Sequence, residues 1–121
     1  MRKFRKWHDY LIERLGADKD EAIGYLDVAL EEYQQDGDTP FFLNGIRNVI
    51  EAHGGITELA KRTHMSPDAI QKILSSDKAP HVDTLGTILN ALGCRLSVVP
   101  LKKEEPKLES TPENQRISAA G

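Results

Sequence analysis

The chain has 121 residues, of which 39% are hydrophobic, so it can build one modest core. Its single cysteine, Cys94, excludes an intramolecular disulfide and a zinc site made of paired cysteines. No apolar run is long enough to span a bilayer, and no apolar segment follows the basic start, so we expect no membrane helix, no signal peptide and a cytoplasmic location.

The charge is unevenly distributed along the chain. The formal net charge of -3 taken alone argues against a nucleic-acid partner. Residues 15–39, however, hold one Lys and eight acids, which gives -7 for that segment. Residues 40–100 hold six basic and five acidic residues, which gives +1. A DNA-binding domain is therefore possible in the second segment, provided that its few cations are well placed.

The first predicted helix covers residues 4–15. Trp7, Leu11 and Leu15 recur four residues apart, which is the spacing of one helical face. Gly16 is expected to end this helix as a left-handed C-terminal glycine.

A second, acidic helix is predicted to follow. Asp18 or Asp20 can cap its start, and it is expected to run to about Gln35. Its apolar stripe consists of Ala22, Leu26, Ala29 and Tyr33, widened by Ile23 and Leu30. Its other face carries Asp27, Glu31 and Glu32. That acidic face is either a solvated surface or a docking face for a basic protein. Because QDGDTP then breaks the pattern, we expect residues 1–39 to form an N-terminal helical extension of a domain over residues 40–100.

The domain over residues 40–100 contains a helix-turn-helix pattern. Pro40 opens a helix that Gly54-Gly55 closes. Two short helices follow, the first over Ile56–Thr63. Ser66 caps the second, with Pro67 at its first position and Asp68 in its first turn, a strong helix-start signature.

The turn between these helices departs from the usual pattern. Glycine is favoured there because the backbone is left-handed, and His64 stands in its place; a histidine at positive φ is uncommon but tolerated. The small Ala60 suits a close helix crossing. The residues predicted to face inward are Leu59, Ala60, Met65, Ile70 and Ile73, a spacing that suits a helix-turn-helix unit.

The polar residues left outside are of the types that contact DNA. Gln71 can pair with adenine, Lys72 can donate to guanine and Asp68 can accept from cytosine. Arg62 and the helix start at Thr84 are candidate phosphate contacts. The full predicted DNA-binding set is Thr57, Lys61, Ser66, Pro67, Asp68, Gln71, Lys72, Ser75, Ser76, Lys78 and Thr84. The alternative is that these residues are ordinary polar surface and that the helix-turn-helix serves only as a scaffold.

The end of the chain is predicted to contain one more helix, one strand and a tail. The helix opens at Asp83 or just before it, and Gly93 ends it. Its inward residues are predicted to be Val82, Leu85, Ile88, Leu89 and Leu92. RLSVVP, residues 95–100, alternates as a short strand, which needs a partner from another chain, either a second copy or a different protein. Residues 101–121 have the composition of a disordered tail. The expected fold is therefore all-α, with five or six helices, a lambda-repressor-like helix-turn-helix and one short C-terminal strand.

Several stretches resemble those of a known family. They are Gly-Gly-Ile-Thr-Glu-Leu-Ala at 54–60, Ser-Pro-Asp-Ala-Ile-Gln-Lys at 66–72, and Asp83-Thr84-Leu85 running to Ala91-Leu92-Gly93. Residues 41–99 resemble the HigA-like addiction-module antidote proteins with a Cro/repressor-type helix-turn-helix, and YLDVALEE at 25–32 resembles the helix that this family carries before the domain. The resemblance implies an antitoxin that neutralises a RelE-like ribonuclease toxin and, as a homodimer on operator DNA, represses its own operon.

Catalytic and cofactor-binding patterns are missing from the sequence. The four histidines show no metal-ligand spacing, and no glycine-rich phosphate-binding motif occurs, so we expect no enzyme activity, no metal and no cofactor. Three functions remain open. They are an antitoxin that also represses its operon, a free-standing phage-like repressor without a toxin, and a protein-interaction module that has lost DNA binding. A toxic neighbouring gene product would separate the first from the second, and salt-dependent DNA binding would exclude the third.

Overall fold

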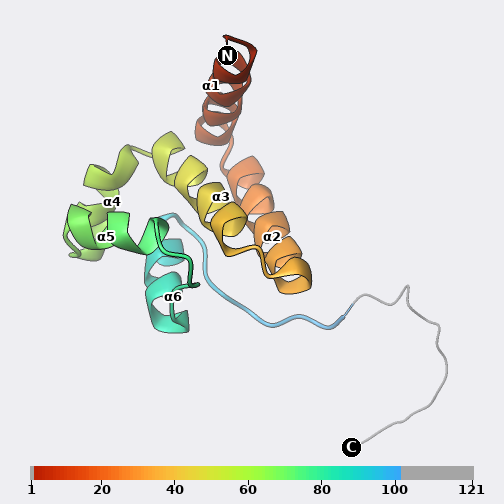
Figure 1. Ribbon diagram of the computed structural model, residues 1–121, viewed down its shortest axis with the longest axis vertical. Helices are drawn as coiled ribbons and strands as arrows, with labels where there is room; N and C mark the ends of the chain where they lie inside the picture. The colour runs from red at the N-terminus through yellow and green to blue at the C-terminus, as the bar shows by residue number, and fades with distance from the viewer. Residues whose placement is uncertain (1, 102–121) are drawn as a thin grey trace, which may run out of the picture.

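A computed structural model describes residues 2–101, with side chains from Lys6 onward (Figure 1). The described residues form six helices and no strand, so the predicted all-α class is confirmed. The helices are α1 (Arg2–Ala17), α2 (Lys19–Asp36), α3 (Thr39–Ala52), α4 (Gly55–Thr63), α5 (Pro67–Leu74) and α6 (Val82–Ala91). None of these helices combines the length and the apolar character needed to cross a membrane.

Helix α3 is the centre of the molecule. It packs against α1 and α2 on one side and against α4 and α5 on the other, as Figure 1 shows. Its inward residues Leu43, Ile46, Val49 and Ile50 are each at most 2% exposed. Buried residues of the other five helices join them in one continuous core, which extends from Leu15 to Leu92. Helices α1 and α2 pack on α3, and α3 packs on α4 and α5, so α3 connects the N-terminal helices to the helix-turn-helix.

The corner between α1 and α2 differs from the prediction. Helix α1 does not end at Gly16 but continues to Ala17. Gly16 is needed for close packing instead, because a Cβ at this position would lie 3.0 Å from the carbonyl oxygen of Ala52 in α3. Asp18 caps α2 as predicted, its carboxylate accepting from the backbone N–H of Asp20 at 3.0 Å.

Among the described side chains of α1, only those in its second half, from Leu11 on, contact the core. Leu15 is 2% exposed, whereas Trp7, on the same predicted stripe, is 61% exposed. The reason is that α1 projects beyond the end of α3, so its first turns have no helix to cover them (Figure 1). The ring nitrogen Nε2 of His53 lies 3.3 Å from the carbonyl oxygen of Leu15 and donates to it, which holds α1 against α3.

The C-terminal part corrects two further predictions. Val82 was expected inside, but as the first residue of α6 it lies beyond the core and is 75% exposed. The strand predicted over 95–100 is wrong for the single chain. The segment is extended, with Leu96 packed against the core and Val98 almost fully exposed, and no neighbouring strand within the described residues supplies the hydrogen bonds of a sheet. The predicted tail lies, apart from Leu101, outside the described residues.

Candidate nucleic-acid interface

Helices α4 and α5 form a helix-turn-helix unit whose turn is made by His64. The backbone of His64 is left-handed, at φ 62° and ψ 26°, and its N–H donates to the carbonyl of Ala60 at 2.9 Å. The hydroxyl of Thr63 accepts from the N–H of Met65 at 3.3 Å and closes the other side of the turn. His64 is the only non-glycine residue at positive φ in the described part of the chain. The predicted left-handed histidine turn is confirmed.

The inner side of this unit packs mostly as predicted. Leu59, Ala60 and Ile70 are buried, and Ile70 is completely inaccessible. Met65 and Ile73 are only partly buried but contact the same core. The unit is therefore anchored through its apolar side, which leaves the opposite side of α5 free.

The start of α5 is formed as the sequence predicts. The hydroxyl of Ser66 accepts from the N–H of Ala69 at 3.0 Å, and Pro67 takes the first helical position. This capping bond uses one of the two acceptor lone pairs of the Ser66 hydroxyl, so the O–H donor and one lone pair stay free. Ser66, Pro67, Asp68, Gln71 and Lys72 are all exposed and form the outer surface of α5.

Arg47, in α3, is a part of this surface that sequence reasoning missed. Its Nη1 donates to Oε1 of Gln71 at 3.3 Å. The bond orients the Gln71 amide and leaves its two N–H donors unused by this contact. Arg47 is also the one cation of α3, at a position outside the apolar stripe, and this was the available signal. Because 24 residues separate the partners, only the folded chain brings them together.

A shallow hollow gathers several of the predicted phosphate contacts beyond the end of α5. It measures about 300 Å³ and is lined by Lys72, Ser76, Lys78, His81 and Thr84, among others. The backbone N–H of Thr84 already donates to the carboxylate of Asp83 at 2.8 Å, so it is not free for a phosphate. The two lysines are the cations of this hollow.

A second hollow lies between α3 and the loop after α5. It measures about 330 Å³, and Asn44, Arg47, Ser75 and Ser76 contribute to its lining together with Asp77. Ser75 therefore lines the same hollow as Arg47. The two hollows share Ser76, so they flank the same loop.

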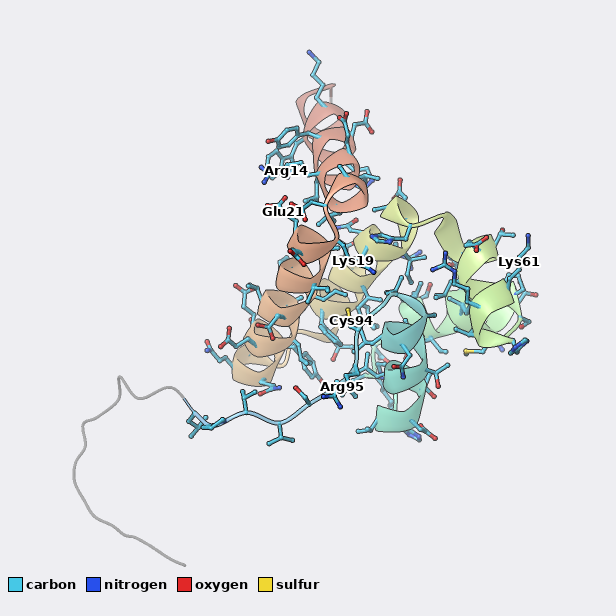
Figure 2. The ribbon with its side chains drawn as sticks, turned by 180° about the vertical axis from the view of Figure 1, so that it is seen from behind. Arg14, Lys19, Glu21, Lys61, Cys94 and Arg95 are labelled. Atoms are coloured by element: carbon cyan, nitrogen blue, oxygen red, sulfur yellow. The ribbon has the colours of Figure 1, made fainter. Side chains whose placement is uncertain are left out.

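The remaining predicted contacts come from α4 and are not all available. Thr57 and Lys61 are exposed, and Lys61 lies on the side of the molecule away from α2 (Figure 2). Arg62 is engaged within the fold, because its Nη1 donates to the carbonyl of Ala91 at 3.0 Å and its Nε to Glu58 at 3.2 Å. Arg62 therefore caps the end of α6 and is a poor candidate for a phosphate contact.

Two further kinds of site, a metal centre and a reactive cysteine, can be compared with this surface. Within residues 2–101, no three His, Cys, Asp or Glu side chains are close enough together to hold a metal ion. Partial burial raises the pKa of the Cys94 thiol, although the charge of Lys19 works against this shift. A raised pKa favours the thiol over the reactive thiolate, which suits a packing residue better than a nucleophile.

Comparison with known families identifies the chain. A family model described as "Probable addiction module antidote protein" matches residues 9–100. The chain belongs to this family. The match begins inside α1 and ends after the extended segment, so the antidote module includes α1 and α2 as well as the helix-turn-helix. An antidote counteracts a toxin, so membership implies a toxin partner. Comparisons with curated proteins and with solved structures gave no match.

Proposed function

We propose that this antidote binds its operator through the outer surface of α5, represses its own operon and neutralises a RelE-like toxin. The observation that carries the DNA-binding part is the bond between Arg47 and Gln71 on that surface. It holds a base-reading side chain next to a cation that can contact the phosphate backbone.

The supporting charges are few. The exposed or half-buried cations on this side are Arg47, Lys61, Lys72 and Lys78, opposed by Asp68 and Asp77. Each phosphate contact made by a cation contributes a salt slope of about -0.9 to the logarithm of the binding constant. We therefore expect modest salt dependence and weak non-specific binding, so that base contacts contribute much of the operator affinity.

The length of α5 favours a homodimer on the DNA. Helix α5 has eight residues, so it is about 12 Å long and can contact only a few consecutive base pairs. A site read by one such helix would occur too often in a genome to be specific. Two copies on half-sites about one helical turn apart would double the number of bases that are read.

The direct test is Gln71→Ala with Gln35→Ala as its control. Gln35 is also an exposed glutamine, near the end of α2, a helix that does not contact α5. Binding is measured by fluorescence anisotropy on a duplex from the region upstream of the gene and on a scrambled duplex, over a range of salt concentrations. We expect Gln71→Ala to weaken upstream-duplex binding by about 1–3 kcal/mol, with little change on the scrambled duplex, and Gln35→Ala to change neither.

Two outcomes of this experiment would overturn the DNA-binding proposal. Equal loss on both duplexes would show that Gln71 does not read bases. Salt-independent or absent binding of the unmodified chain would favour the protein-interaction module, because phosphate contacts always release counterions.

The toxin part of the proposal rests on family membership and on charge. Membership in the antidote family favours this function over a free-standing repressor. An RNA-directed toxin of the RelE type needs a basic surface, and the acidic α2 suits such a partner. The test is growth of cells that express each small neighbouring reading frame with and without this chain. Arrest that the chain relieves is the expected result, and the absence of any toxic neighbour would return the free-standing repressor to first place.

A further inference from the structure

The corner between α1 and α2 leaves large apolar side chains uncovered. Trp7 is 61% exposed, Tyr10 49% and Val28 51%. They line a hollow of about 670 Å³, here called the α1–α2 hollow, together with Leu11 and Tyr25. A contiguous apolar patch of this kind on a small protein usually marks an interaction site.

The side chains of α1 in this hollow are the types that dominate binding energy at protein interfaces. Trp7, Tyr10 and Arg14 are spaced three and four residues apart, so they share one helical face. Trp, Tyr and Arg are also the residues most enriched among interface hot spots. The rings of Trp7 and Tyr10 are 5.8 Å apart, and the Arg14 guanidinium lies 5.7 Å from the Tyr10 ring.

The hollow is pre-formed. Nε of Arg14 donates to Glu21 at 2.8 Å and Nη1 donates to the Tyr10 hydroxyl at 3.1 Å, which ties α1 to α2 and fixes one aromatic wall. Figure 2 shows Arg14 and Glu21 side by side where the two helices meet. Gly24 also lines the hollow, and a Cβ at this position would meet no atom within 4 Å. A partner would lose little free energy in ordering such a surface.

The charge on the α2 side of the hollow indicates the kind of partner, whereas α1, with five basic and two acidic residues, is net positive. Helix α2 carries six acids and one Lys. Of these acids only Glu21 takes part in an ion pair among the side chains that the structure describes. The free carboxylates include Asp20, on the wall of the hollow, and Glu31, one helical turn beyond Val28. A partner with a basic surface around a protruding apolar side chain is complementary to this arrangement.

The α1–α2 hollow is also separate from the candidate DNA surface. Helices α1 and α2 contact α3 and each other, but neither contacts α5. Figure 1 shows α5 on the opposite side of α3 from α2. Both surfaces can therefore be occupied at the same time.

We propose that the α1–α2 hollow is the docking surface for the toxin, which inserts an apolar side chain between Trp7 and Val28 and places basic residues against the carboxylates of α2. The inference rests on the toxin-neutralising part of the proposed function and is independent of the DNA-binding part. The expected occupant of the hollow is a basic protein, and the alternative occupant is a second copy of this chain.

Two variants of the full chain test this proposal, and each has a matched control. Trp7→Ala removes a wall of the hollow, and Phe41→Ala, at a comparably exposed aromatic residue of α3 outside it, is the control. Gly24→Leu places a bulky side chain at the lining of the hollow, where a Cβ would meet no atom within 4 Å, and Gly24→Ala is its control because a methyl group leaves most of the space open. Both substitutions of Gly24 should keep or raise the melting temperature, since glycine is unfavourable inside a helix.

The probe is the product of the neighbouring reading frame, purified from its complex with this chain, and binding is measured by titration calorimetry. We expect Trp7→Ala and Gly24→Leu to weaken binding tenfold or more, with both controls within threefold of the unmodified chain. The affinity of all four variants for the operator duplex should stay within twofold of that of the unmodified chain. A failure of the DNA-binding proposal is thereby distinguished from a failure of toxin docking. The affinity of the unmodified complex should also fall as salt is raised.

Three results would overturn the proposal. If the toxin affinities of Trp7→Ala and Gly24→Leu both stay within threefold of that of the unmodified chain, the toxin docks elsewhere. A chain that is dimeric alone and becomes monomeric with these substitutions would assign the hollow to a second copy. Failure to isolate any complex between the chain and the neighbouring product would remove the partner itself.

Discussion

Replacing His64 by glycine tests whether the left-handed turn is a source of strain. The left-handed backbone conformation costs a residue with a Cβ roughly 1–2 kcal/mol relative to the right-handed helical conformation. His64 is exposed at φ 62°, so its removal sacrifices little packing. Glycine removes the strain, but its greater conformational freedom in the unfolded chain offsets about 0.5–1 kcal/mol of the gain. We therefore expect His64→Gly to leave stability unchanged or to raise it by up to about 1.5 kcal/mol.

Two further substitutions serve as comparisons for His64→Gly. Lys61→Gly places the same residue inside α4, where glycine should lower stability by about 0.5–1 kcal/mol. His64→Val places a β-branched residue at positive φ and should lower stability by about 1–2 kcal/mol, or at least 4 °C in melting temperature for a domain of this size.

The measurement is urea unfolding followed by far-UV circular dichroism on the four proteins. The order of stability should be His64→Gly at or above the unmodified chain, then Lys61→Gly, then His64→Val. If glycine lowers stability as much at position 64 as at position 61, or if valine is tolerated at 64, the turn is not left-handed in solution and the reasoning fails.

Two other positions give matched predictions of stability. Ser66→Ala should lower the free energy of unfolding by about 1 kcal/mol, because its hydroxyl caps α5, whereas Ser97→Ala in the extended segment should change it by less than about 0.5 kcal/mol. Equal effects in urea unfolding would contradict the capping role. Gly16→Ala should destabilise although alanine favours helices, because its Cβ would lie 3.0 Å from the Ala52 carbonyl oxygen. Gly24→Ala, with open space around it, should stabilise by about 1 kcal/mol, and thermal unfolding that gives both the same sign would refute the close approach.

Local sequence rules were sufficient for the helix-turn-helix unit. The Ser66 cap, the first-turn proline and the left-handed His64 each depend on backbone geometry within about four residues, and all three are present as predicted. The exposed outer surface of α5 followed from the same periodicity that placed Ile70 inside.

Features that depend on distant neighbours could not be predicted in this way. Gly16 has the sequence context of a helix-ending glycine, yet its role is set by the approach of Ala52. Residues 95–100 alternate as a strand should, but the fold puts no second strand beside them. Periodicity predicts which residues share a face, but it does not predict which other element covers that face.

Interactions between near neighbours along the chain set the helices, the turn of the helix-turn-helix and the outward-facing residues of α5, so these features could be predicted from the sequence. The folded arrangement was needed to show that Arg47 supports Gln71, that Arg62 caps α6 and that Trp7 remains uncovered. Those outcomes depend on how α3 positions the other helices, and contacts between residues 24 or 29 positions apart exist only once the chain has folded around it.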